Sequence, residues 1–251
     1  MKDISFDFKG KRFVVIGASS GMGRQIATDI ADSGGDVLAI ARNKKRLREI
    51  EEKYPKRIVT EAVDVRNKDE LETVISEYVG KLGKFHGSVY TAGISKTTVL
   101  RAFSEDCARE IMDINYWGWI NLMNLICKSK YSLNASSNVV VSSVSAHSGE
   151  AGNFAYNASK AAISSCVRTF AKEIAKRGCR VNSVSPGFIK TALTDNYFSD
   201  RGFSERIIDK HLLGLGTTAD ISGVICFLLS DKAGWITGAD FVVDGGYLIS
   251  D

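Results

Sequence analysis

Two side chains four residues apart, Tyr156 and Lys160, have the chemistry to move a proton together. The pattern around them predicts a helix from about Ala155 to Lys176, and residues at this spacing share one helix face. An ammonium beside a tyrosine favours the phenolate form, so such a tyrosine can exchange a proton with a carbonyl oxygen near neutral pH. Many helices carry this pair on their surface, so the spacing alone is weak evidence.

Two further polar residues are candidates for the same site. Ser143 follows an apolar run from Asn138 to Ser142 that predicts a strand. Ligands of parallel sheets bind at the carboxyl ends of strands, which is where this serine is expected. Asn115 falls inside a long helix predicted from Glu105 to Lys128, where asparagine is unfavourable without a partner.

A glycine-rich turn follows the first apolar run, Phe13 to Ile16, and opens a helix predicted from Met22 to Ser33. Glycines let the backbone turn tightly and approach a ligand, and the helix N-terminus offers free N–H groups to a pyrophosphate. The spacing is GxxxGxG, and its position between strand and helix predicts a dinucleotide site. The residues expected to contact the ligand there are Gly17, Ser19, Ser20, Gly21, Met22 and Gly23.

The same turn also fits G-x-S-x-G, the nucleophile elbow of serine α/β-hydrolases, with Ser19 as the nucleophile. Only 16 residues precede it, too few for the upstream strand and loop that supply the second oxyanion donor. None of the three histidines, His86, His147 and His211, has a distinctive context, and we expect the last two at the surface. The dinucleotide interpretation is favoured.

The end of the second predicted strand, Val37 to Ile40, decides between the dinucleotides. An acid there would bind ribose hydroxyls, but Asp36 precedes the strand and Arg42 follows it. An arginine pairs with a 2′-phosphate, whereas a carboxylate repels it, so we predict NADP(H) over NAD(H). The residues expected around the adenosine end are Ala41, Arg42, Asn43, Asp64 and Val65, with Arg24 and Lys44 as further basic residues nearby.

Short apolar runs alternate with helical patterns along the whole chain. This order predicts an α/β fold, a parallel sheet with helices on both faces, in one domain over residues 1–251. The remaining expected strands are Arg57–Val63, Ser88–Tyr90, Val181–Val184 and Phe241–Val243, and the remaining helices Lys44–Lys53, Leu71–Val79 and Thr218–Leu229. The least periodic stretch, residues 188–216, is predicted to be a substrate loop.

The composition excludes several classes of protein. The 251 residues are 44% hydrophobic and 25% charged, with a net charge of +4 spread along the chain, which indicates a globular protein without a nucleic-acid footprint. Five dispersed cysteines without a Cys-x-x-Cys pair are typical of reduced cytosolic thiols and predict no metal site. No apolar run approaches the roughly 20 residues of a membrane span, and no apolar leader is visible. We therefore expect a cytoplasmic protein that binds no membrane.

Taken together, these motifs resemble those of the short-chain dehydrogenase/reductase family, with the 3-oxoacyl-carrier-protein reductases as the nearest variety. The matching segments are Gly17 to Gly23, Asn115, Ser143, Tyr156-Asn157-Ala158-Ser159-Lys160, Pro186-Gly187 and Asp244-Gly245-Gly246, and the resemblance runs from about Phe8 to Tyr247. It implies a Rossmann-type, doubly wound domain with seven parallel strands.

The resemblance also implies roles in the reduction of a carbonyl group. Tyr156 is then the general acid, supported by Lys160, which also binds the nicotinamide ribose. Ser143 bonds the substrate carbonyl, and Asn115 positions a water in the proton relay. The other residues implied near the cofactor are Ala92, Gly93, Pro186, Gly187, Ile189 and Thr191. A homotetramer or homodimer is expected, with the helices of Asn115 and Tyr156 packed between subunits.

Some positions depart from the family pattern. Ile16 stands where the family has threonine, and Tyr90-Thr91 replaces an Asn-Asn pair before Ala92. The carrier-protein reductases dock an acidic carrier with two basic residues; Arg177 matches one, but the other falls on Asn134.

We predict an NADP(H)-dependent oxidoreductase that transfers hydride between nicotinamide and a carbonyl or secondary alcohol. The substrate stays open between a 3-oxoacyl thioester, free or carrier-bound, a sugar and another small ketone. The alternative from another class is a non-catalytic NADP-binding sensor or scaffold. The intact Ser–Tyr–Lys set argues against this alternative, since a sensor needs only the residues that bind the dinucleotide.

Overall fold

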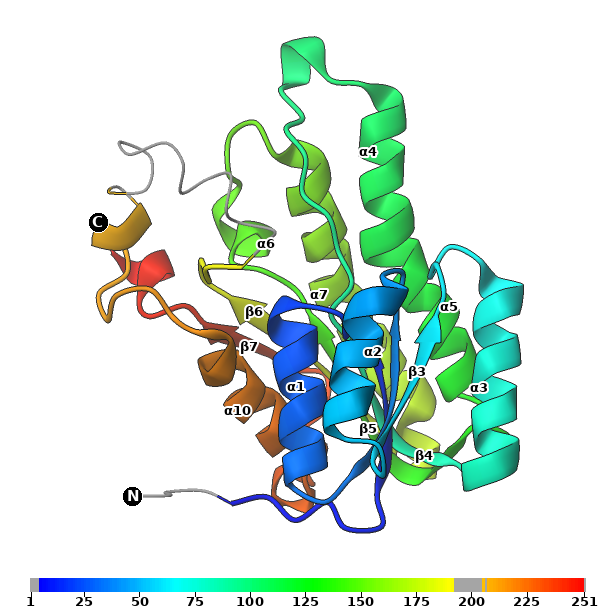
Figure 1. The fold of residues 1–251 in the computed structure, drawn as a ribbon. Helices are drawn as coiled ribbons and strands as arrows, with labels where there is room; N and C mark the ends of the chain where they lie inside the picture. Colours follow the sequence, from blue (N-terminus) through cyan, green and yellow to red (C-terminus); the bar gives the residue numbers. More distant parts are fainter. Residues whose placement is uncertain (1–4, 192–204, 206, 251) are drawn as a thin grey trace.

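Seven strands form one parallel sheet in the order β3-β2-β1-β4-β5-β6-β7 (Figure 1). The computed structural model describes residues 5–191, 205 and 207–250. The strands are β1 (Arg12–Ile16), β2 (Asp36–Ala41), β3 (Ile58–Ala62), β4 (Phe85–Tyr90), β5 (Ser132–Val141), β6 (Arg180–Pro186) and β7 (Asp240–Val243). The predicted fold class is confirmed.

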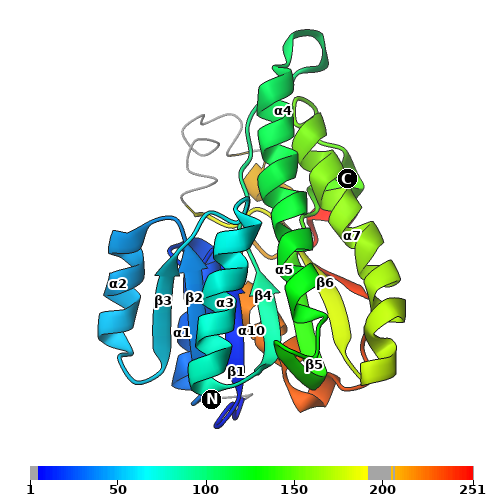
Figure 2. The same ribbon diagram turned by 90° about the vertical axis from the view of Figure 1, so that its right-hand side faces the viewer.

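Helices cover both faces of the sheet, so its strands are apolar throughout. In β1, Phe13 and Val15 enter one core cluster, and Val14 and Ile16 enter the other. The first face carries α1 (Gly21–Asp32), α2 (Lys44–Lys53) and α10 (Thr218–Leu229). The second carries α3 (Lys68–Leu82), α5 (Gly118–Ile126) and α7 (Phe154–Ile174), which face the viewer in Figure 2.

Several elements extend beyond their apolar runs. The helix α3 begins at Lys68, three residues before its first expected residue, because the Asn67 side chain accepts a hydrogen bond from the Glu70 N–H and caps it. Strand β5 begins at Ser132, where polar residues pair with the sheet without adding to the apolar pattern. The apolar pattern therefore does not predict helix starts set by polar caps or the polar ends of strands.

The helix predicted from Glu105 to Lys128 is interrupted. It consists of α4 (Glu105–Met112), a π-helical turn (Asp113–Trp117) and α5, which ends at Ile126. A π turn inserts one extra residue per turn and rotates the side chains that follow it, and such turns are frequent at functional sites. Asn115 lies in this turn and is fully buried.

The strand order reverses direction between β1 and β4. From β1 the chain moves to β2 and β3 on one side, and then crosses to β4 on the other. In open α/β sheets, ligands bind at this switch point, outside the carboxyl ends of the strands. The glycine turn after β1 and the segment Thr91 to Gly93 after β4 meet there.

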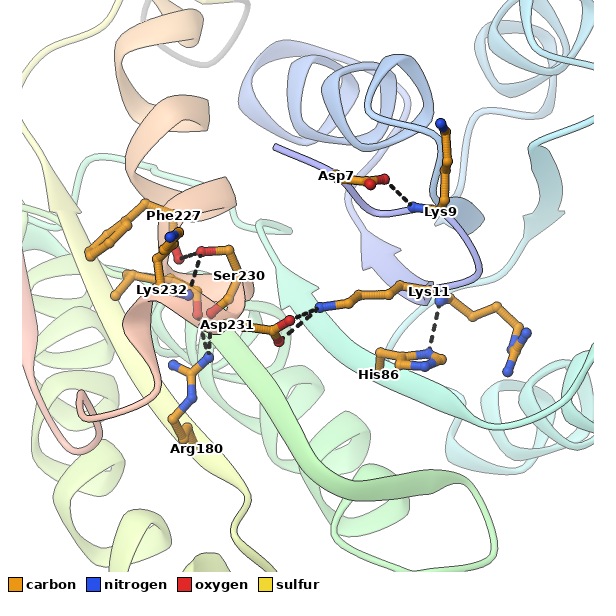
Figure 3. A network of polar contacts seen from close by, with 11 residues as sticks. Asp7, Lys9, Lys11, His86, Arg180, Phe227, Ser230, Asp231 and Lys232 are labelled. Atoms are coloured by element: carbon orange, nitrogen blue, oxygen red, sulfur yellow. Dashed lines mark hydrogen bonds and ion pairs between the residues drawn. The ribbon is translucent and has the colours of Figure 1, made fainter. Parts of the chain in front are cut away.

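At the opposite end of the sheet, a buried arginine closes the end of α10 (Figure 3). Arg180 begins β6 and donates to the carbonyl oxygens of Leu228 at 2.9 Å and Ser230 at 3.1 Å. Burial lowers the pKa of this guanidinium below its ordinary value, but the helix carbonyls favour a cation at this position. The neighbouring pair of Lys11 and Asp231 is far more exposed.

We predict that Arg180→Met lowers the free energy of unfolding by about 2 kcal/mol, because the Leu228 and Ser230 carbonyls each lose a charged donor, and this loss exceeds the gain from no longer burying the charge. Urea denaturation measures this loss. Lys11→Met is the control and should cost less than about 1 kcal/mol, as exposed ion pairs do. Equal losses in the two variants would contradict the assigned role of Arg180.

Within residues 5–191, 205 and 207–250, no helix is long and apolar enough to span a membrane. The same residues contain no group of three or more His, Cys, Asp or Glu side chains arranged to hold a metal ion. The expected substrate loop, residues 188–216, includes 192–204 and 206, which lie outside the described residues.

Candidate active site

The glycine turn packs directly against the loop that follows β4. Thr91 donates its hydroxyl hydrogen to the Ile16 carbonyl at 2.8 Å, and a Cβ at Gly17 or Gly23 would collide with Thr91. These glycines are therefore required by close packing. The Ser20 hydroxyl makes no capping bond to α1, so this N-cap side chain does not compete with an anion for the first-turn N–H groups.

A cavity of about 360 Å³ lies over the switch point. Among the predicted residues, those that line it are Gly17, Ser19, Ser20, Gly21, Met22, Gly23, Ala41, Arg42, Asn43, Asp64, Val65, Ala92, Gly93 and Thr191. Thr191 lies beside Gly21, across the mouth of the turn. The other predicted residues do not line the cavity: Tyr156 and Lys160 are on α7, and Pro186, Gly187 and Ile189 lie at and after the carboxyl end of β6.

Arg42 and Arg46 face this cavity from the end of β2 and the first turn of α2. Of the additional basic residues expected there, Arg24 is paired with Glu49 at 3.1 Å, and neither Arg24 nor Lys44 lines the cavity. The structure adds Arg46 to the basic residues at this end of the cavity. Its N–H donates to Asn43, whose side chain thereby caps α2.

Asp64 lies at the cavity wall with its carboxylate already paired. Arg66 donates to both carboxylate oxygens, at 2.6 Å to the nearer, and this pairing lowers the pKa of Asp64 below its ordinary value. The carboxylate therefore stays ionised as a fixed acceptor beside the cavity. Asp36, by contrast, pairs with Arg57 at the amino end of β2, away from the cavity.

Lys160 is buried under the expected catalytic tyrosine. Its ammonium donates to the Val141 carbonyl at 2.8 Å and lies 5.7 Å from the centre of the Tyr156 ring. Burial lowers the pKa of Lys160 from 10.5 to about 8. The group is therefore mainly cationic at neutral pH, and the Tyr156 side chain is partly exposed above it.

Asn115 braces the loop after β4 against α7. Its Oδ1 accepts from the Ile94 N–H at 2.8 Å, and its Nδ2 donates to the Ile94 carbonyl and to the Ser159 hydroxyl, both at 3.0 Å. A Cβ added to Gly93 would lie 3.3 Å from the Asn115 oxygen and 3.7 Å from the Lys160 ammonium. Gly93 thus joins the cavity to the Asn–Lys pair.

Ser143 follows β5 and is nearly buried, and its oxygen accepts from the Ser145 N–H at 3.1 Å. The short helix α6 (Ser145–Ser148) starts there. His147 on this helix contacts the Asp240 carboxylate at 2.8 Å, and Ser164 of α7 donates to the same group. The carboxylate therefore ties the segment after Ser143 to β7 and α7.

The carboxyl end of β6 is packed by aromatic groups. Gly187 lies against His211, whose Nε2 accepts from the Phe188 N–H at 3.1 Å. His211 is buried, which corrects the expectation of a surface position. It stacks near Tyr247, with ring centres 4.9 Å apart. Ile189, farther along, pairs with Gly216.

The histidine partners weaken the hydrolase alternative. His86 accepts from the Arg12 N–H at the amino ends of the strands, at the far end of the sheet from Ser19. His147 and His211 are held by Asp240 and Phe188, as described above. Ser19 thus lies in the turn beside the cavity, and each of the three histidines has a partner other than Ser19.

Sequence reasoning missed some cavity residues. Those residues are Ile16, Arg46, Val63, Thr91, Ile94 and Ile114. Arg46 could have been found, since it follows Arg42 by four positions across a helix start marked by Asn43. Ile114 could not, because its position depends on the π turn.

A parallel sheet with a glycine turn at its switch point is the architecture of Rossmann-type dinucleotide-binding proteins. The family described as "Enoyl-(Acyl carrier protein) reductase" matches residues 17–248. The chain is 31% identical over 245 residues to the 3-oxoacyl-[acyl-carrier-protein] reductase FabG of Thermotoga maritima, covering 96% of this chain and 99% of that protein.

Solved structures agree with this assignment. A short-chain dehydrogenase/reductase (glucose/ribitol dehydrogenase) from Brucella melitensis superposes with a TM-score of 0.92 at 28% identity, over 97% of this chain and 99% of that one. A short-chain type dehydrogenase/reductase from Mycobacterium ulcerans gives 0.91 at 25% identity, over 98% and 92%. The chain therefore belongs to the short-chain dehydrogenase/reductase family of oxidoreductases.

Proposed function

We propose that this chain is an NADP(H)-dependent reductase of carbonyl compounds that acts in the cytoplasm. One arrangement carries the proposal: a cavity with Arg42 at one end is continuous, through Gly93, with Asn115 and Lys160. The five cysteines are free thiols, in keeping with a reducing compartment. We further propose that residues 1–251 form one domain.

The cavity suits a phosphorylated dinucleotide. The uncapped N-terminus of α1 and the close-packed glycines would hold the pyrophosphate, and Arg42 and Arg46 would hold a 2′-phosphate. Guanidinium groups bind phosphate with paired, charge-assisted hydrogen bonds. When bound, the nicotinamide supplies the hydride that reduces the carbonyl carbon.

The chain's own residues bind the carbonyl and move the proton. Ser143 would donate to the carbonyl oxygen, and Tyr156 would give that oxygen its proton. The Lys160 ammonium, 5.7 Å from the Tyr156 ring centre, stabilises the phenolate that forms. The amide oxygen and nitrogen of Asn115 both form hydrogen bonds within the chain. We therefore propose that Asn115 fixes the loop after β4, along which the relay water would bind.

The carrier-docking position differs from the expected pair of basic residues. Arg177 donates to the Asn134 side chain at 3.2 Å and to the carbonyls of Cys127 and Ser132 at 2.7 and 2.8 Å. Its donors thus fix the turn before β5. We propose a small ketone, a keto-sugar or a 3-oxoacyl thioester as substrate, and a carrier-bound thioester only as a further option.

We also propose a homotetramer or homodimer. The segment before α4, the π turn and the start of α7 expose Phe103, Trp117 and Phe154, at 42%, 53% and 37% of their areas, and the rings of Phe103 and Phe154 are in contact. Large apolar groups gathered on neighbouring helices are typical of subunit contacts. These are the helices that the family resemblance places between subunits.

A panel of ketones, keto-sugars and acyl thioesters, assayed for NADPH consumption, tests the function. We expect turnover of at least one class. If NADPH binds but no carbonyl compound is reduced, the chain is a sensor and the proposal fails.

We predict that Arg42→Ala weakens NADPH binding about 10- to 50-fold, the worth of the lost charge-assisted bonds, and changes NADH binding less than about threefold. Quenching of protein fluorescence measures both affinities. Lys44→Ala is the control, since Lys44 lies beside Arg42 in sequence but does not line the cavity. Equal losses for the two dinucleotides would exclude Arg42 as the 2′-phosphate ligand.

A further inference from the structure

The last residue of β4, Tyr90, is a buried tyrosine whose hydroxyl has one specific partner. The residue is 1% exposed, and its hydroxyl donates to the Ile114 carbonyl. Burial raises the pKa of Tyr90 above its ordinary value, so the hydroxyl keeps its proton and remains a donor.

The Ile114 carbonyl needs this donor because of the π turn. In a regular α-helix, the Gly118 N–H would bond the Ile114 carbonyl, four residues back. Here it donates to the Asp113 carbonyl, five residues back. A buried carbonyl without a partner is strongly disfavoured. The tyrosine hydroxyl therefore replaces the helix donor that the π turn removes.

Gly118 makes room for this contact. A Cβ at Gly118 would collide with the Tyr90 hydroxyl and press on the Val65 side chain, 2.8 Å away. Glycine is unfavourable inside a helix, so its presence here is explained by the approach of Tyr90. Val65 and Ile114 both line the cavity, so the contact lies directly behind the site.

We propose that Tyr90 is a positioning residue for the reaction, acting through Asn115. By bonding Ile114, it fixes the turn from which the Asn115 side chain reaches Ile94 and Ser159. The inference rests on the proposed carbonyl reductase. The family pattern has an asparagine at position 90, and the proposal explains why this chain has a tyrosine there.

Tyr90→Phe tests the proposal, because it removes only the hydroxyl. We expect kcat for the reduced carbonyl to fall about 10- to 100-fold, as small misplacements of catalytic groups do, while KM and the NADPH Kd change less than about twofold. Tyr78→Phe is the matched control. Tyr78 is also buried, but its hydroxyl has no hydrogen-bond partner among the described residues, so its loss should leave kcat unchanged.

Two further measurements separate positioning from general damage. In an Asn115→Ser background, Tyr90→Phe should lower kcat no further, because residues acting through one another are not additive. An undiminished effect there overturns the route through Asn115, and an unchanged kcat in Tyr90→Phe alone overturns the proposal outright.

Amide hydrogen exchange tests the contact without relying on activity. Exchange over residues 112–119 should speed up in Tyr90→Phe relative to β5 of the same protein, and not in Tyr78→Phe. Unchanged exchange there overturns the contact. A wild-type chain that reduces no carbonyl overturns the proposed function and, with it, the positioning role of Tyr90 in the reaction. Hydrogen exchange then still shows whether the Tyr90 hydroxyl holds the π turn.

Discussion

Tyr156→Phe should lower kcat about 10³-fold or more, with NADPH affinity unchanged within about twofold. The ring stays over the Lys160 ammonium, 5.7 Å away in the native protein, so packing is kept and only the proton donor is lost. General acid catalysis by a positioned side chain contributes typically 10²- to 10⁴-fold. Steady-state kinetics with a ketone substrate and fluorescence titration with NADPH measure the two quantities.

Tyr54→Phe is the control for this prediction. Its hydroxyl donates to Asp32 on the outside of α1, so removing it should leave kcat unchanged. Retained turnover in Tyr156→Phe would mean that another group gives the proton. A parallel loss of NADPH binding would instead mean that the hydroxyl serves the cofactor and not the carbonyl.

The fold was predictable because this sheet is covered on both faces. Strands such as β1 and β2 are then continuous apolar runs, and α1 and α10 follow with regular helical periodicity. The direction of a parallel sheet places all carboxyl ends on one edge, so Gly17, Arg42 and Ser143 could be assigned to one side of the molecule from their order alone.

The finer structure of the site was not predictable in the same way. Between Ile111 and Leu122 the apolar residues keep a helical spacing, and an inserted π-turn residue leaves that pattern almost unchanged. The structure alone reveals that Asn115 is in a π turn. The glycine at 118 was the available signal, since it is out of place inside a helix.

The same limit applies to polar partners. His211 is buried because both of its ring nitrogens have partners: the Ile207 carbonyl four residues earlier, and the Phe188 N–H, which comes from a different segment at the end of β6. Arg180 is buried for the same reason, beside the end of α10. Polarity alone assigns such residues to the surface, and only tertiary contacts place them inside.

Lys160→Met should abolish most activity and yet stabilise the fold at neutral pH. Burial lowers the pKa of Lys160 from 10.5 to about 8, and each unit corresponds to about 1.4 kcal/mol. Holding the ammonium in place therefore costs about 3 kcal/mol at pH 7, partly offset by about 1 kcal/mol for its bond to the Val141 carbonyl. We expect kcat to fall about 10²- to 10³-fold and the free energy of unfolding to rise by about 1–2 kcal/mol.

The pH dependence of this gain identifies its source. Between about pH 8 and 10.5 the unfolded chain keeps the lysine proton that the native state has released, so the stability of the wild type rises with pH. The advantage of Lys160→Met is therefore largest below pH 8 and disappears toward pH 10.5. Urea denaturation at several pH values measures the difference between the two proteins. Lys172→Met is the control, because Lys172 is an exposed lysine on the same helix, and it should show no such trend. If Lys160→Met is less stable than the wild type at pH 7, the buried ammonium does not destabilise the native state.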